Sequence, residues 1–170
     1  MKILFAILLV LLIFIFPQSV GAEELDRLQI FFFEIGDDGE DVLNYYHIAV
    51  PSRLSVEDRA IVVFSEIFDN ADADKMIYAP PQVRILDIIF HGAASHLVVN
   101  LSAEILNYGG THFEDRLIYK LLINAAGIGN VAYLTILIDG RPQYFPEGTI
   151  ILKNSLALFN CPRIKIFLQF

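Results

Sequence analysis

The sequence contains no tryptophan and a single cysteine, and its 12 lysines and arginines are outnumbered by 20 acidic residues. One cysteine excludes an internal disulfide and any cysteine-rich zinc module. The formal net charge of -8 argues against nucleic-acid binding, which needs a basic surface to meet the phosphates. A length of 170 residues corresponds to one domain. The apolar fraction of 55% is high for a soluble domain and excludes intrinsic disorder.

The first 22 residues have the order of segments that is typical of a secretory signal peptide. Lys2 precedes an uninterrupted apolar run, and Pro17 and a stretch of small residues follow it. We expect cleavage after Ala22 and therefore an extracytoplasmic protein, either secreted or associated with the envelope. The alternative is an uncleaved N-terminal anchor, since residues 3–22 are almost long enough to cross a bilayer. In that case the membrane contact is limited to this segment.

The rest of the chain predicts strands and two helices. Six short runs rich in β-branched and aromatic residues predict strands at residues 28–34, 45–50, 83–90, 96–101, 131–138 and 141–145. One helix is expected to begin at Ser55 and end near Asp69, and a second to begin at Thr111 and end at Gly127 or Gly129. Hairpins combined with two helices predict an α+β fold. We expect a small, mostly antiparallel sheet with both helices on one face.

Both helices have recognisable start signals. Ser55 is expected to cap the first helix, and the acidic residues that follow it suit the positive end of the helix dipole. Thr111 and Glu114 have the T-x-x-E spacing of a capping box at the start of the second helix.

The alternation of side chains along the central strands separates two faces of the expected sheet. One face is uniformly apolar and should carry the helices: Leu86, Ile88, Phe90, Leu97, Val99, Leu101, Leu134, Ile136 and Ile138. The second face is of mixed polarity: Ile85, Asp87, Ile89, Val98, Asn100, Val131, Tyr133, Thr135 and Leu137. Such a face suits a surface that is covered by a partner or by the chain's own tail.

The last part of the chain, residues 151–170, is an apolar C-terminal extension that has no helical period. It is expected either to add strands to the sheet or to be presented to another subunit. Its Cys161 is a single thiol, for which an intermolecular bridge or an unreactive thiol are the alternatives.

Candidate sites for chemistry are sparse. His91 and His96 flank a predicted turn, but a metal site needs three or four ligands. The aspartates Asp69, Asp72 and Asp74 lack the glycine and distal glutamate of a calcium loop. Another acidic cluster, formed by Asp37, Asp38, Glu40 and Asp41, lies in a turn that favours such residues for backbone reasons.

Two further features have simple structural explanations. Gly109 and Gly110 precede a helix, where a small anion can bind, but the lysine of a phosphate-binding loop is missing. The triplet Asn100-Leu101-Ser102 fits a glycosylation signal but lies on a predicted strand. No serine or cysteine has a recognisable base partner. We therefore predict that the chain is not an enzyme and has no catalytic residues, cofactor or metal site.

One segment of the sequence resembles a known family, the GerMN domains of sporulation and spore germination proteins. The matching features occur in the family's order: the proline loop at Ala79-Pro80-Pro81, the step Val99-Asn100-Leu101-Ser102, the pair Gly109-Gly110 before a helix, and a strand that ends at Asp139-Gly140. We assign residues 23–150 to a single GerMN-like domain.

The resemblance implies a non-enzymatic extracytoplasmic domain, similar in fold to the ring-building modules of bacterial envelope assemblies. Relatives in endospore formers serve the assembly that joins the mother cell and the forespore, and they affect germination. The expected function is protein–protein association in the bacterial envelope, in sporulation or spore germination. The second sheet face and the tail are the expected contact surfaces, for self-association or for other proteins. The alternative is a small secreted or envelope module that binds a glycan, an anion or Ca²⁺.

Overall fold

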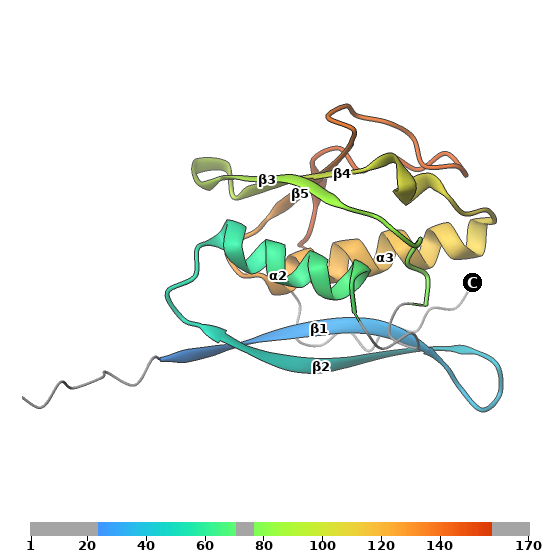
Figure 1. Cartoon of the computed structure of the whole chain (residues 1–170), viewed down its shortest axis with the longest axis horizontal. Coiled ribbons are helices and arrows are strands. Elements are labelled where there is room, and N and C mark those ends of the chain that lie inside the picture. The colour runs from blue at the N-terminus through green and yellow to red at the C-terminus, as the bar shows by residue number, and fades with distance from the viewer. Residues whose placement is uncertain (1–23, 71–76, 158–170) are drawn as a thin grey trace, which may run out of the picture.

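A computed structural model describes residues 24–70 and 77–157 of the chain (Figure 1). The expected signal peptide, Asp72, Asp74 and Cys161 lie outside the described residues. Within the described ranges, no helix has both the length and the apolar character needed to cross a membrane.

The chain begins with a long antiparallel hairpin of β1 (Leu25–Ile35) and β2 (Asp41–Pro51). Both strands are rich in the aromatic and β-branched residues that favour extended backbone. The turn between them contains Gly39, whose φ of 81° is a conformation that glycine adopts without steric penalty. Side chains on one face of the hairpin, among them Leu28 and Ile30, are buried. The hairpin is therefore a separate two-stranded sheet that covers the core with one face.

Two helices follow the predicted pattern closely: α2 (Val56–Phe68) and α3 (Thr111–Gly127). The Ser55 hydroxyl oxygen accepts a hydrogen bond from the backbone N–H of Asp58 at 3.0 Å, which confirms the predicted cap of α2. The apolar row of Leu117, Leu121 and Ala125 on α3 is fully buried, as its fourfold spacing predicts.

The second sheet has four strands in the order β3-β4-β5-β6. They are β3 (Ile85–His91), β4 (His96–Leu101), β5 (Tyr133–Ile138) and β6 (Asn154–Ser155), with short 3₁₀ turns at η2 (Gly92–Ala94) and η3 (Ala103–Leu106). Strands β4 and β5 are parallel, since α3 forms the crossover between them, and the other pairs are antiparallel.

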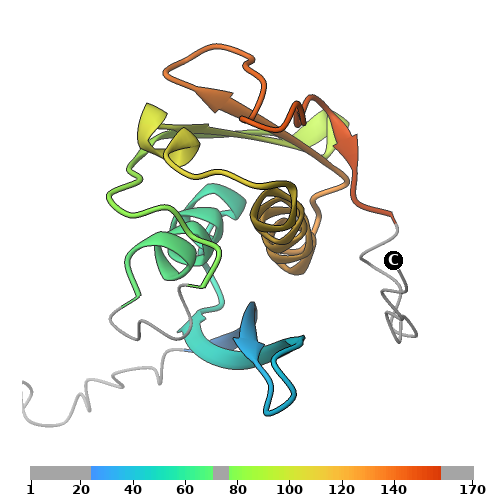
Figure 2. The same ribbon diagram turned by 90° about the vertical axis from the view of Figure 1, so that its right-hand side faces the viewer.

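The elements form three layers (Figure 2). The four-stranded sheet lies on one side of the two helices and the β1–β2 hairpin lies on the other. One continuous apolar core connects the layers, from Leu28 of the hairpin through Phe64 of α2 to Val99 of β4.

These observations confirm the α+β class, the two helices and the mostly antiparallel strands. The helices lie on one face of the four-stranded sheet, but the hairpin expected to join that sheet is a separate sheet on the other side of the helices.

The strand predicted at 141–145 is wrong. After the turn at Asp139 and Gly140 only Arg141 pairs back, with Ile138. Pro142 comes next and has no N–H to continue a ladder. Instead β6 forms the last strand, from within the segment assigned to the C-terminal extension.

The predicted faces of the sheet are correct within the strands except at the start of β3, and Val131, predicted on the mixed face, precedes β5 and is buried in the core. The register shifts between Ile85 and Asp87, which is a β-bulge that places one extra residue opposite β4. Ile85 therefore packs against the core, while Leu86 is 43% exposed. Leu86 had been expected on the apolar face and Ile85 on the mixed face, because strict alternation of side chains does not allow for a bulge.

The predicted capping box of α3 is also wrong. Gly110 is the N-cap and no side chain caps the helix. Glu114 is 1% exposed and accepts hydrogen bonds from the Tyr108 hydroxyl and from the backbone N–H groups of Glu147 and Thr149. The carboxylate therefore holds the loop after β5 rather than the start of its own helix.

Candidate functional site: a groove beside an edge strand

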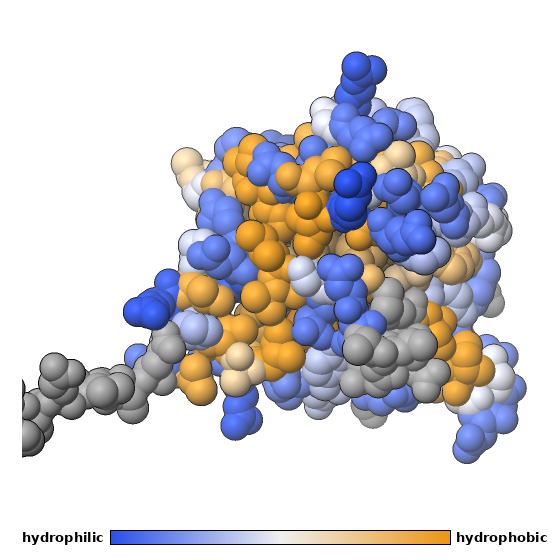
Figure 3. All heavy atoms as spheres, in the orientation of Figure 1, coloured by the Kyte–Doolittle hydropathy of each residue, from blue (hydrophilic) through white to orange (hydrophobic). Residues whose placement is uncertain are grey.

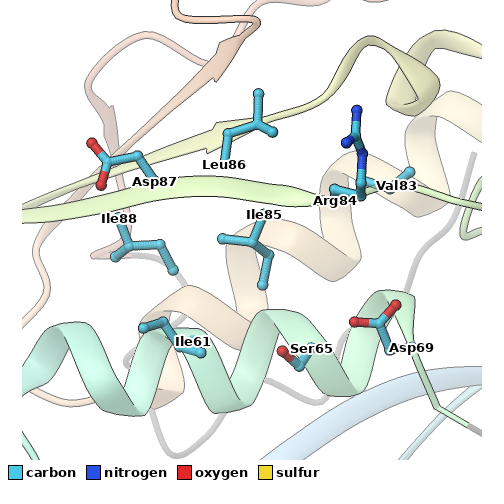
Figure 4. Close-up of a pocket in the computed structure, with 9 residues that line it drawn as sticks. All are labelled: Ile61, Ser65, Asp69, Val83, Arg84, Ile85, Leu86, Asp87 and Ile88. Carbon is cyan, nitrogen blue, oxygen red and sulfur yellow. The ribbon is translucent and has the colours of Figure 1, made fainter.

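A groove of about 620 Å³ lies between α2 and β3 (Figure 4). It is lined by Ile61, Ser65, Asp69, Val83, Arg84, Ile85, Leu86, Asp87 and Ile88. Ile85 and Ile88 point from β3 toward the helix, and Ile61 points from α2 toward the strand. Leu86 and Asp87 point away from the helix on the other side of β3.

The α2 wall of the groove is a row of residues at fourfold spacing, which places them on one side of the helix. The row is Glu57, Ile61, Ser65 and Asp69. Its two ends are acidic, and Ile61 and Ser65 lie between them. The groove itself is lined by two carboxylates, Asp69 and Asp87, and one guanidinium, that of Arg84. Glu57 lies beside the groove, where it bonds Phe90.

The apolar part of this surface is exposed to solvent. The side chain of Ile61, in the groove, is 46% exposed. Leu86, on the side of β3 away from the helix, is 43% exposed. Figure 3 shows apolar atoms gathered over β3 and α2 on this side of the molecule. Exposed apolar surface that continues across neighbouring elements is typical of interaction sites.

Strand β3 ends the four-stranded sheet in the described part of the chain, so one of its backbone edges faces this groove. The N–H of Phe90 points to that edge, where it donates to the Glu57 carboxylate at 3.3 Å. In an antiparallel pair such groups alternate along the strand. The N–H and C=O of Ile88 therefore also point away from β4 and toward the groove.

A second feature is a polar stripe along α3, at fourfold spacing on the side that faces the hairpin. The stripe consists of His112, Arg116, Lys120 and Asn124. At its first turn, the Asp41 carboxylate accepts hydrogen bonds from Arg116 Nε and from the Tyr78 hydroxyl at 2.7 Å. His112 Nε2 lies 2.9 Å from the same carboxylate. Two donors and a histidine ring thus converge on one buried carboxylate, which joins the start of β2 to α3.

This cluster changes the titration of its members. Burial disfavours the ionised form of Asp41, but hydrogen bonds from Arg116 and Tyr78 outweigh it and lower the pKa of Asp41 below its usual value. Burial and the same carboxylate raise the pKa of Tyr78 to about 12. Asp41 is therefore ionised and fully engaged with its partners, which suits a structural ion pair rather than a proton-transfer group.

The inner half of the stripe holds β1 and the loop that precedes Tyr78. Lys120 is 1% exposed, and its ammonium donates to the C=O of Ile77 at 2.6 Å. Burial lowers the pKa of Lys120 to about 7. Asn124 accepts from the N–H of Phe31 and donates to its C=O, both at 2.9 Å. The amide thus imitates a neighbouring strand and closes that edge of β1.

The structure places the predicted metal candidates as follows. The rings of His91 and His96 lie 5.9 Å apart between centroids, but His96 Nε2 bonds the Thr135 hydroxyl at 2.9 Å. Of the acidic turn, Asp37, Asp38 and Glu40 remain at the hairpin tip, while Asp41 joins the α3 stripe. Among residues 24–70 and 77–157, no three metal-ligating side chains gather into a site.

The start of α3 is not open to an external anion. The N–H of Gly110 donates to the Glu147 carboxylate at 2.9 Å, so an internal acid already occupies the helix start. Asn100 lies on β4 as predicted, and its side-chain oxygen accepts from the N–H of Gly140 at 2.8 Å. The Gly110–Glu147 and Asn100–Gly140 hydrogen bonds therefore hold the loops that follow β4 and β5.

The sequence reasoning missed the groove and the α3 stripe. The stripe could have been found in the sequence. Four polar residues at fourfold spacing, beside an apolar row at the same spacing, indicate a helix that is covered on two sides. The groove had none, because it depends on which strand ends the sheet.

The three-layered arrangement is that of a GerMN domain. The chain is similar to the first GerMN domain of the sporulation protein GerM from Bacillus subtilis, with a TM-score of 0.54 and 14% identity over 75% of this chain and 96% of that one. It matches one half of the tandem GerMN domains of the same protein, with a TM-score of 0.54 and 10% identity over 76% of this chain and 46% of that one. These likenesses establish the fold.

A putative lipoprotein from Clostridium perfringens gives a weaker likeness, with a TM-score of 0.41 and 13% identity over 70% of this chain and 78% of that one. No family model matches the sequence, and no curated protein does.

Proposed function

We propose that this chain is an exported, non-catalytic domain that mediates protein–protein association in the bacterial envelope, in sporulation or spore germination. The observation that carries the proposal is the apolar groove between α2 and the edge strand β3, on a fold shared with a sporulation protein. Exposed backbone groups beside exposed apolar side chains are what an extended segment of another protein needs for binding.

Export is supported by the sequence of residues 1–22. The test is expression of the full chain in an endospore-forming host, followed by cell fractionation and N-terminal sequencing. We expect the protein outside the cytoplasm with Glu23 as its first residue. An uncleaved chain in the membrane fraction corrects the cleavage only, whereas a cytoplasmic chain contradicts the proposal.

Association is tested in the same host with a photo-crosslinking residue at position 61, in the groove. The matched control carries it at position 144, since Tyr144 is 68% exposed and lies away from the groove. We expect a defined protein adduct from position 61 during sporulation and none from position 144. Equal labelling at both positions, or labelling at neither, contradicts association through the groove.

A second candidate is a small ligand-binding module of the envelope, and the size of the groove is the observation that favours it. A volume of about 620 Å³ lies in the range of ligand pockets. Glycans, small anions and Ca²⁺ are the ligand classes to test by thermal shift. A ligand whose stabilisation is removed by Ile61→Asp and kept in Tyr144→Asp supports this function.

A further inference from the structure

We propose that the groove between α2 and β3 accepts residues 163–170 from a second copy of this chain, bound as an added strand on the edge of β3. This inference rests on the proposed function and names the partner for its contact surface. Three observations on different parts of the molecule support it: the sequence pattern of residues 163–170, the charge of the groove, and the place where the described chain ends.

Residues 163–170 have an apolar residue at every even position, and three of the four odd positions are polar. Ile164, Ile166, Leu168 and Phe170 are apolar, while Arg163, Lys165, Phe167 and Gln169 occupy the other positions. A period of two places the four aliphatic and aromatic even residues on one face of a strand. On the edge of β3, that face meets Ile61, Ile85 and Ile88 in the groove.

The charges of the two surfaces are complementary. Residues 158–170 contain two basic residues and no acidic ones, in a chain whose net charge is -8. The groove carries Asp69, Asp87 and Arg84 on its walls and Glu57 beside it, so its carboxylates outnumber its one guanidinium. Asp87 points to the side of β3 away from the helix, which is the side that Arg163 and Lys165 take when the even residues fill the groove. Opposite charges on neighbouring strands stabilise pairing.

The backbone of β3 can accept only a short strand. On the outer edge, the N–H of Phe90 is already bonded to Glu57. At the other end Arg84 faces β4, since its N–H donates to the Ser102 hydroxyl at 2.9 Å and its C=O accepts from the N–H of Ser102. The open outer stretch is therefore centred on Ile88. An eight-residue strand has the length to cover it together with the neighbouring apolar side chains.

The geometry favours a second copy over the chain's own tail. Described residues end at Ala157, next to β6, and β6 and β3 are at opposite ends of the sheet. Three strand spacings separate these ends by roughly 14 Å, and passing over the side chains of one face adds roughly 10 Å. Residues 158–162 and the bonds that flank them span about 20 Å at full extension. The connection is too short to return, whereas a neighbouring copy has no such limit.

A donor at one end of the sheet and an acceptor at the other define a head-to-tail contact. Such contacts repeat from copy to copy unless the rotation closes a ring. Self-association should therefore give a series of oligomers whose size grows with concentration, rather than a dimer alone.

The test uses residues 23–170, which include every described element, so that it does not depend on export. Two preparations carry Cys161→Ser. One adds Ile61→Cys in the groove, and the other adds Ile166→Cys in the donor segment. Mild oxidation of the mixture is expected to give a mixed disulfide dimer. The matched control replaces Ile61→Cys with Tyr45→Cys. Tyr45 is 52% exposed and lies on β2 of the hairpin, outside the groove, so this control should give no mixed disulfide dimer.

Three results overturn the inference. No mixed dimer, or equal dimer with the Tyr45→Cys control, excludes the groove as the acceptor. A further variant carries both Ile61→Cys and Ile166→Cys in one chain. If it forms a disulfide within the chain at every concentration, the occupant of the groove is the chain's own tail. Because photo-crosslinking at position 61 in the host reports any partner protein, the proposed function can survive either result.

A charge exchange adds a second readout that a loss of folding does not produce. Lys165→Glu is expected to weaken self-association by roughly tenfold in analytical ultracentrifugation. Adding Asp87→Lys should restore it, since the exchanged pair again has opposite charges. Both variants should keep the thermal unfolding temperature of the parent. Failure of Asp87→Lys to restore association contradicts the placement of Lys165 beside Asp87.

Discussion

The buried lysine of α3 gives the sharpest prediction about stability. Lys120 is 1% exposed, and burial lowers its pKa from 10.5 to about 7. In the unfolded chain the ammonium is in water and keeps its ordinary pKa. The difference corresponds to about 5 kcal/mol that opposes folding at pH 7 and below, because there the charge has to be buried or the proton released.

The sign of the pH dependence follows from the proton count. Between pH 7 and 10.5 the unfolded chain binds a proton at Lys120 that the folded chain has lost, so stability rises with pH in this window. Each pH unit contributes about 1.4 kcal/mol. Below pH 7 both states are protonated at this residue and the contribution stays constant. Measurements should stop near pH 10, since the pKa of Tyr78 is raised to about 12 and unfolded tyrosines ionise first.

Lys120→Met removes the charge and keeps most of the volume. It also removes the hydrogen bond to the C=O of Ile77, which costs about 1–3 kcal/mol. The net expectation at pH 7 is a gain of about 2–4 kcal/mol in the free energy of unfolding. For a chain of this size that corresponds to roughly 4–16 °C in Tm.

The assay is urea unfolding followed by circular dichroism at pH 7, 8, 9 and 10. The parent should gain stability across the series, and Lys120→Met should remain nearly flat. Lys153→Met serves as the control, because Lys153 is exposed, and it should follow the parent. Parallel curves for the parent and Lys120→Met would contradict the prediction, since the buried ammonium would then have no energetic effect.

Substitutions at three further residues test other contacts. Asn124→Ala should cost about 2–3 kcal/mol in urea unfolding, because it leaves the N–H and C=O of Phe31 without their partner, and a loss below about 0.5 kcal/mol contradicts the clamp. Asp41→Asn should cost about 2–4 kcal/mol at pH 7. Since the pKa of Asp41 is lowered on folding, its contribution is complete above the unfolded pKa of 3.8 and is lost as pH falls through the folded pKa, so acid titrations of parent and variant should converge. Ser55→Ala should lower thermal stability by about 1 kcal/mol and Ser55→Gly by only a few tenths, and equal losses argue against the hydroxyl cap.

Local elements could be predicted from the sequence because they depend on neighbouring residues. Ser55 caps α2 through a contact three residues away, and Gly127 ends α3 where expected. The hairpin turn at Asp139 and Gly140 also forms, with both residues at positive φ. The return strand after this turn stops after Arg141, because Pro142 has no N–H to continue the pairing.

The arrangement of the layers could not be predicted in the same way. Alternating side chains show that β1 and β2 have one apolar face, but not which sheet or helix that face covers. The deciding contacts connect distant residues, such as Arg116 with Asp41 and Asn124 with Phe31. The bulge at Leu86 is equally invisible, because a single shift of register changes no composition.

The α3 stripe explains why the hairpin settles on the helices rather than on the sheet. In a strand pair, the N–H and C=O of one residue point to the partner and those of the next residue point outward. Asn124 meets both outward groups of Phe31, so a slip of the hairpin by one residue along α3 would aim the amide at a residue whose backbone groups already bond β2. The same slip would draw Asp41 away from Arg116. Two polar contacts, one at each end of the stripe, therefore fix the register of an otherwise apolar interface. The hairpin covers α3 and also contacts α2, through Arg59 with Asp26 and Tyr46 with Glu66. The side of α2 that faces β3 is left to form the open groove.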